Sequence, residues 1–233
     1  MTLPGWLSPE EWDAIRLSLA VAARSVCFGL PLAVLAAYAL ARGRFPGRWL
    51  LDALVHLPLV LPPVVVGWGL LLLFGVRGPL GAALLDWFGV RLVFTTAGAA
   101  LATAVMSFPL MVRAIRLSLE AVDPGLEAAA RTLGAGRWDR FATVTLPLMA
   151  PGILAGAVVA FAAALGEFGA VITFVSNIPG ATQTLPLAIY SALQAPGGEA
   201  TAAKLSAVSF VLAMAGLSLS ELIARRMQRW LGR

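Results

Sequence analysis

Long stretches without a charged residue constrain the fold of this chain more than any other feature. Six such windows cover residues 25–41, 53–76, 92–112, 141–166, 168–198 and 205–220. A helix needs about 20 mostly apolar residues to cross roughly 30 Å of hydrocarbon, so most of these windows could span a membrane. A soluble domain carries about 25% charged residues, whereas this chain carries 12%. The sequence therefore predicts an all-α transmembrane bundle and excludes a disordered chain, a coiled coil or an ordinary soluble enzyme.

Five membrane spans are predicted from these windows. They cover about residues 12–41, 51–74, 92–112, 147–175 and 203–224. The window 168–198 is not expected to hold a sixth span, because proline and glycine interrupt it at 177–180 and 196–198. A short surface or re-entrant helix from about Gln183 to Leu193 is expected there instead. In the second span, the prolines between Leu57 and Pro63 predict a break or a bend.

The distribution of basic residues predicts the orientation in the membrane. With five spans, twelve of the 17 Lys and Arg residues lie on one side and three on the other, with Arg16 and Arg24 inside the first span. Cytoplasmic loops carry an excess of Lys and Arg, so we expect the amino terminus outside and the carboxyl terminus in the cytoplasm. The net charge of +5 therefore indicates orientation and not a nucleic-acid partner.

The longest polar segment, about 113–147, is predicted to be a cytoplasmic loop within a single domain spanning residues 1–233. Asp123 and Pro124 are typical of a helix start, with Asp as the N-cap and Pro at the first helical position. A helical stretch then runs to Gly134, and a second element begins at Arg137 and carries Trp138. From the residues alone, this loop is either a docking element for another protein or a solvated connector.

The same loop resembles the cytoplasmic signature of ABC importer permeases, E-A-A-x-x-x-G, nine residues, then I-x-L-P. Gly134 is followed nine residues later by Val144-Thr145-Leu146-Pro147, with Val in place of Ile. Glu127 lies seven residues before Gly134 instead of six, so Ala128 occupies the usual Glu position. The resemblance implies that a short helix docks on an ATPase subunit, through residues matched to the signature or next to it. These are Glu127, Ala129, Ala130, Arg131, Gly134, Arg137 and Trp138.

Three later segments are similar to the molybdate branch of these permeases. They are Leu165–Gly180, Thr184–Tyr190 and Gln194–Glu199. Sulfate permeases share a related Gly-Glu-aromatic-Gly segment and diverge after it. The resemblance implies a type I importer fold in the bacterial inner membrane, working as a homodimer with two ATPase subunits and an external molybdate-binding protein. It also implies that this chain is not an enzyme and binds no cofactor, since ATP and Mg belong to the ATPase.

Glu167 is the one acid well inside a long apolar stretch, and such residues are functional candidates. A carboxylate repels an oxyanion, so we expect Glu167 to pair with a basic residue, of which Arg24 is a candidate, or with a helix end, in preference to gating. Hydroxyl groups nearby are expected to bond to their own helices more often than to a substrate. The candidates for a translocation path or gate are Ser107, Glu167, Phe168, Gly169, Thr173, Ser176 and Asn177.

Catalytic and metal-binding patterns are missing from the sequence. His56 has no second ligand at metal spacing and is expected to be a buried, hydrogen-bonded histidine, while Cys27, the single cysteine, excludes an intramolecular disulfide and is expected to be buried. No phosphate-binding G-x-x-x-x-G-K-[ST] occurs, so the chain cannot drive transport by itself. The alternatives are the same machinery for tungstate, sulfate or thiosulfate, a membrane-embedded enzyme, or a non-transporting membrane scaffold.

Overall fold

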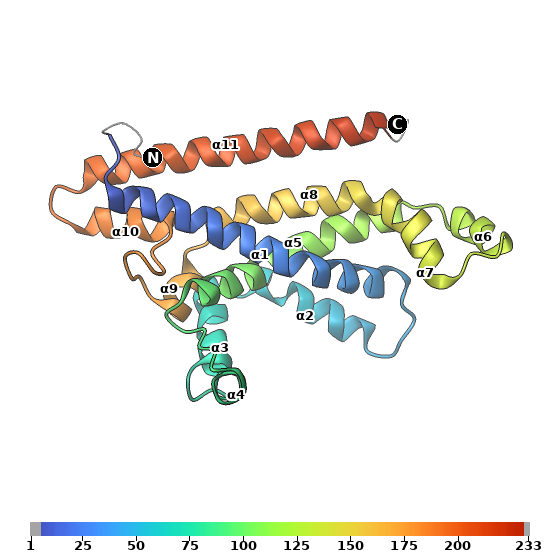
Figure 1. Cartoon of the computed structure of the whole chain (residues 1–233), viewed down its shortest axis with the longest axis horizontal. Coiled ribbons are helices and arrows are strands. Elements are labelled where there is room, and N and C mark those ends of the chain that lie inside the picture. Colours follow the sequence, from blue (N-terminus) through green and yellow to red (C-terminus); the bar gives the residue numbers. More distant parts are fainter. Residues whose placement is uncertain (1–5, 231–233) are drawn as a thin grey trace.

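Helices joined by short loops make up the structure, a computed structural model that describes residues 6–230 of the chain. No strand occurs among the described residues. In chain order the elements are α1 (Pro9–Arg42), α2 (Arg48–Val60), α3 (Pro63–Phe74), α4 (Pro79–Phe88), α5 (Thr96–Glu120), α6 (Pro124–Thr132), α7 (Arg137–Arg140), the π-helical turn η1 (Phe141–Thr145), α8 (Leu146–Leu165), α9 (Gly169–Val175), α10 (Leu185–Gln194) and α11 (Glu199–Trp230). The long helices α1, α5, α8 and α11 run along the longest axis, and α3 and α4 project away from them (Figure 1).

Within the described residues, four helical segments are long and apolar enough to cross a membrane. They are Pro9–Arg42, Thr96–Glu120, Arg137–Leu165 and Glu199–Leu219. The pair α2 and α3 makes a fifth if it counts as one span, although its two halves are bent by 118°. The all-α fold with about five spans is therefore confirmed.

The centre of the bundle is α5, which packs against both α1 and α8. Small residues allow this close packing: Ala99 and Ala102 are fully buried, and a Cβ added at Gly152 would lie 2.8 Å from the carbonyl oxygen of Ala114. Larger side chains such as Met111 fill the space between these contacts. The position of α5 thus follows from small residues where the helices approach most closely and from buried larger side chains between those contacts.

Two of the predicted spans are broken in the structure, the second as predicted and the one at 147–175 contrary to prediction, and their broken parts meet. Pro62 and Pro63 have no backbone N–H, so the hydrogen-bond ladder of α2 ends and α3 starts in a new direction. The helix α9 follows α8 after a short break at 166–168 and packs against α3. A Cβ added at Gly67 of α3 would lie only 2.6 Å from the carbonyl oxygen of Ala170, so glycine is required at this crossing.

The starts of α1 and α11 are joined at the opposite end of the bundle from α6. Ser8 and Glu11 form a capping box, in which the Glu11 carboxylate accepts from the Ser8 N–H at 2.6 Å. The buried Glu11 also pairs with Lys204 of α11 at 2.7 Å. This ion pair fixes the first and last long helices to each other.

Several predicted boundaries differ from the structure. The span predicted over 147–175 is two helices, α8 and α9, because the chain leaves the helical path at Gly166. The span predicted over 92–112 continues as α5 to Glu120, so the polar loop is shorter than 113–147. The short helix expected at about 183–193 is α10. Cys27, expected to be buried, is exposed, and Arg233, counted in the orientation, lies outside the described residues.

Candidate functional site

The polar loop between α5 and α8 folds as the sequence predicts, as two short helices separated by glycine. The Asp123 carboxylate accepts from the N–H of Gly125 at 2.8 Å, and Pro124 occupies the first turn of α6. After α6, Gly134 adopts a left-handed conformation with φ of 87°, which lets the chain turn toward α7. In Figure 1 this loop extends beyond the ends of α5 and α8.

Most of the predicted docking residues lie on the outer face of this loop. Trp138 is 85% exposed, and so is the neighbouring Leu133, which was not among the predicted residues, at 88%. The members that are exposed with them are Ala129, Arg131, Gly134 and Arg137, whereas Ala130 is half-buried. An exposed leucine and tryptophan next to arginines is the composition of a protein-binding surface.

Glu127 is the exception among these residues, because it faces the protein. Its Oε1 atom accepts from the Thr145 hydroxyl at 3.1 Å and lies 3.4 Å from Nη2 of Arg42 at the end of α1. The same Arg42 nitrogen donates to the carbonyl oxygens of Leu119, in the last turn of α5, and of Val122, just after that helix, at 3.4 Å each. We call this set of contacts the Arg42–Glu127 tether. It joins α1, α5, α6 and η1, while the neighbouring Ala128 is exposed.

The intramembrane candidate Glu167 lies at the break between α8 and α9. It is half-buried, and its Oε1 atom accepts from the backbone N–H of Ala170 at 2.9 Å, in the first turn of α9. Of the two pairings expected for Glu167, the structure therefore shows the one with a helix end, the start of α9. The suggested pairing with Arg24 is absent among the described residues, since Arg24 is exposed and Glu167 forms no ion pair there.

The other path candidates divide into two groups. Ser107 and Thr173 donate to carbonyl oxygens of their own helices, those of Thr103 at 2.9 Å and Gly169 at 2.8 Å, as expected for hydroxyls in apolar helices. By contrast, Asn177 donates to Ser191 of α10 at 2.7 Å, and its Oδ1 atom is buried without a partner.

The remaining path candidates surround α9. Gly169 packs against Pro63 of α3, and the ring of Phe168 lies 5.2 Å from that of Tyr190. Ser176 is exposed, with φ of 65°, at the end of α9. The structure thus brings Glu167, Phe168, Gly169 and Thr173 to the crossing of α3 and α9, and places Ser107 on α5.

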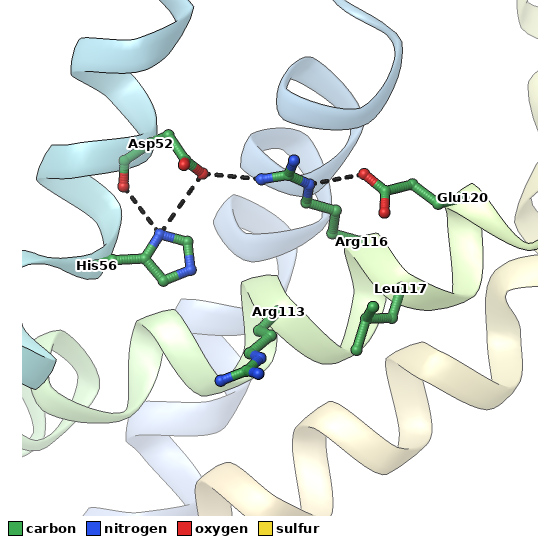
Figure 2. A pocket seen from close by; sticks show the side chains of 6 residues that line it. All are labelled: Asp52, His56, Arg113, Arg116, Leu117 and Glu120. Carbon is green, nitrogen blue, oxygen red and sulfur yellow. Dashed lines mark hydrogen bonds and ion pairs between the residues drawn. The ribbon is translucent and has the colours of Figure 1, made fainter.

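A third polar cluster, which we call the α2–α5 pocket, was not predicted. It is a cavity of about 340 Å³ lined by Asp52, His56, Arg113, Arg116, Leu117 and Glu120. As Figure 2 shows, Arg116 reaches across to α2, donating to Asp52 at 2.8 Å and to Glu120 of its own helix at 2.8 Å. His56 is half-exposed, contrary to expectation, and its Nδ1 atom lies 2.8 Å from the Asp52 carbonyl oxygen.

A match to a protein-family model shows which family this chain is part of. The model, described as binding-protein-dependent transport system inner membrane component, matches residues 29–231. The chain belongs to this family. It is accordingly a multi-pass permease of the plasma (inner) membrane, and its match includes all the helices described above except the first part of α1.

Two relatives show where this permease lies within the family. The molybdenum transport system permease protein ModB of Escherichia coli (strain K12) is 58% identical over 227 residues, which cover 97% of this chain and 99% of ModB. The sulfate transport system permease protein CysT of the same strain is 39% identical over 222 residues, covering 94% of this chain and 80% of CysT. The molybdenum relative is thus clearly the more similar of the two.

The solved structure of a bacterial ABC transporter that imports the acidic polysaccharide alginate has the same fold. Its TM-score against this permease is 0.72 at 19% sequence identity, and the match covers 96% of this chain and 81% of that one. At this identity the likeness concerns the fold alone. It confirms the prediction of an ABC importer permease fold.

The sequence of this permease did not predict that Arg42, Thr145 and the α2–α5 pocket form part of its polar sites. A partial signal was present, because Asp52 with His56 and Arg116 with Glu120 are each four residues apart and therefore share a helix face. Nothing in the spacing indicated that Arg116 reaches Asp52, 64 residues away. Among the described residues, no group of three or more His, Cys, Asp or Glu side chains could hold a metal ion.

Proposed function

We propose that this permease is the membrane subunit of an ATP-driven importer that moves molybdate from an external binding protein into the cytoplasm. The observation that carries the proposal is the 58% identity to a molybdenum transport permease over 97% of this chain. The sulfate permease at 39% identity is a second candidate relative, and it supports sulfate or thiosulfate less well. Tungstate has the same charge and shape as molybdate and remains an alternative substrate.

The proposed importer contains two copies of this permease and two ATPase subunits. The exposed face of the loop around Leu133 and Trp138 supports an ATPase partner, because apolar side chains on a protruding helix lose contact with water when a partner groove covers them. Arg131 and Arg137 would add charge recognition at the rim of that contact. ATP and Mg would bind to the ATPase, and this chain would hold no cofactor.

In this proposal, the Arg42–Glu127 tether carries motion from the loop into the bundle. When the ATPase pair closes, it displaces α6. Glu127 then pulls on Arg42 at the end of α1 and on Thr145 at the start of the α8 span. Arg42 also holds two carbonyl groups at the end of α5, so three spans move with the loop. The bundle would thereby alternate between outward and inward openings.

The crossing of α3 and α9 is the proposed constriction on the translocation path. Broken helices inside a membrane leave backbone groups without partners in their own helix, and such groups commonly line substrate sites in transporters. An oxyanion in transit is held better by backbone N–H groups and hydroxyls than by a fixed charge, because very tight binding would prevent release. Glu167 would shape the crossing through its bond to Ala170 and would not touch the substrate.

The proposal is tested by uptake of labelled molybdate in a bacterial strain that lacks its own molybdate permease. This chain is expressed together with the ATPase and the binding protein of a molybdate importer, and uptake is measured with and without excess tungstate or sulfate. Restored uptake that tungstate reduces and sulfate does not is the expected result. Competition by sulfate alone would assign the sulfate function, and absence of uptake together with failure to copurify with an ATPase would favour a scaffold.

A further inference from the structure

The α2–α5 pocket lies at the same end of the bundle as the polar loop between α5 and α8. It is formed where α2 begins after Gly47 and where α5 approaches its end at Glu120, the last residue before the turn into α6. This is the side that the basic residues predict to be cytoplasmic. Its volume of about 340 Å³ is at the lower end of the range for small-molecule sites, about 300–1,000 Å³.

Charge within the pocket is distributed unevenly around Arg116. Its guanidinium donates to both carboxylates of the pocket, through Nη1 to Asp52 and through Nε to Glu120, each at 2.8 Å. Asp52 also lies 3.6 Å from Nδ1 of His56. Both acids are therefore already engaged by neighbouring donors, and Arg116 is held rigidly between them.

Arg113 has no such partner. Its side chain is exposed, lines the same cavity and takes part in no ion pair with any residue whose side chain the structure describes. In Figure 2, no dashed line joins Arg113 to any of the other residues drawn. The two arginines and two carboxylates of the pocket balance in formal charge, but both carboxylates contact Arg116 and neither contacts Arg113. A guanidinium offers a planar set of N–H donors that matches two oxygens of an oxyanion.

The neighbouring histidine supplies a conditional second donor. Since a carbonyl oxygen only accepts, the Nδ1 atom of neutral His56 carries the proton that is shared with Asp52 at 2.8 Å. Its Nε2 atom is then an acceptor, and it becomes a donor only in the imidazolium form. Arg113 is consequently the main ligand for an anion, and an exposed site with one unpaired cation binds weakly enough to release it.

We propose that Arg113 forms a weak binding site for a tetrahedral oxyanion at the cytoplasmic mouth of the permease. The site would receive the substrate after it passes the crossing of α3 and α9. This inference rests on the proposed function, because the oxyanion class comes from it. The pocket itself is defined by the contacts of α2 with α5 and does not depend on the docking of any ATPase.

Protection of an engineered cysteine tests the site directly. Cys27, the single cysteine of the chain, is replaced by alanine, and Leu117→Cys places a thiol in the pocket, where Leu117 is 61% exposed. The full-length permease is labelled with N-ethylmaleimide, an uncharged reagent, in detergent-solubilised membranes with sodium molybdate, tungstate or sulfate. Sodium chloride at equal ionic strength is the reference, because salt alone screens surface charge.

The labelling rate should fall with oxyanion concentration, by roughly twofold when half of the sites are occupied, as mass action requires. Arg113→Gln should abolish this protection, and Arg113→Lys should retain part of it, which separates loss of charge from misfolding. Arg44→Gln is the matched control, because Arg44 is an exposed arginine on the same side that does not line the pocket. Its protection should equal that of the parent protein.

Two outcomes would overturn the inference. Equal labelling rates with oxyanion and chloride would show that the pocket does not bind an oxyanion, and protection that persists in Arg113→Gln would show that Arg113 is not its ligand. Uptake by the parent protein without protection would overturn this site and leave the transport function intact. Protection without uptake would support this site and contradict the transport function.

Discussion

Glu127 shows how a one-residue offset in a sequence motif corresponds to a different role for the side chain. In the family signature the acidic residue would stand at position 128, where this chain has an exposed alanine. The acid at 127 instead points toward the bundle and contacts Arg42 and Thr145. On a helix, neighbouring positions lie on different faces. The shift therefore turns a residue on the docking face into an internal contact between spans.

Glu127→Gln should uncouple the loop from the bundle without preventing assembly. Glutamine keeps an oxygen that can accept from Thr145 but removes the charge that pairs with Arg42. Such a partly exposed pair contributes about 1 kcal/mol, which corresponds to roughly a fivefold shift between two states. We expect molybdate uptake to fall by about that factor while copurification with the ATPase is unchanged.

The matched control for this change is Glu199→Gln, an exposed glutamate at the other end of the bundle, which should leave uptake unaltered. Arg42→Gln combined with Glu127→Gln should be no worse than the more severe single variant, since both remove one contact. Normal uptake in Glu127→Gln would contradict a role of the tether in coupling.

Gly134→Val should disrupt the docking face. At φ of 87°, a side chain with Cβ costs about 1–2 kcal/mol or more, and a β-branched residue is the least tolerated. The loop would rearrange to relieve this strain, and ATPase copurification and uptake should both be lost. Gly136→Val is the control, because Gly136 has φ of −65°, extended backbone and open space around it. Equal behaviour of the two variants would exclude a specific requirement at Gly134.

At the scale of elements, the two broken helices depend on each other. Prolines end α2, and Glu167 stabilises the start of α9 by accepting from the Ala170 N–H. Each break is a local event, but the crossing of α3 and α9 also needs glycine at position 67 and close contact of Gly169 with Pro63. The two breaks let α3 and α9 pack closely only because Gly67 and Gly169 have no side chain at the crossing.

Gly67→Ala should destabilise this crossing. The added Cβ would meet the backbone of Ala170 at 2.6 Å, so α3 and α9 must separate, and overpacking of this kind costs about 1–3 kcal/mol. We expect a lower thermal unfolding midpoint of the purified permease and reduced uptake. Gly69→Ala, in the same helix with nothing within 4 Å of its Cβ, should be neutral or slightly stabilising. A drop in both variants would indicate general sensitivity of α3.

For the whole molecule, the long helices place two chemically different ends on opposite sides of the membrane. One end carries the polar loop between α5 and α8, the tether and the α2–α5 pocket, and the arginines of that loop lie there. The other end holds the ion pair of Glu11 with Lys204 and the short helix α10. Transport driven from one side requires this polarity, since the ATPase and the binding protein would meet the permease at opposite ends.

Thiol labelling checks this predicted orientation. In the Cys27→Ala background, Trp138→Cys and Glu199→Cys each place an exposed thiol at one end of the bundle. A membrane-impermeant maleimide should label Glu199→Cys in intact cells and Trp138→Cys only in inverted vesicles. The opposite pattern would reverse the topology and would move the α2–α5 pocket to the external face.

The sequence by itself determined the features that depend on local composition. Charge-free windows predicted the spans, because a helix in hydrocarbon needs only apolar side chains and internal backbone hydrogen bonds. Asp123 and Pro124 predicted the start of α6, and the prolines at 62 and 63 predicted the break after α2, since capping and missing N–H groups act within a few residues. The tertiary structure decided which faces meet. The contacts of Arg116 with Asp52 and of Arg42 with Glu127 join residues 64 or more positions apart, and close packing of glycine and alanine surfaces brings them together. That packing depends on the shape of whole helices, which no local pattern specifies.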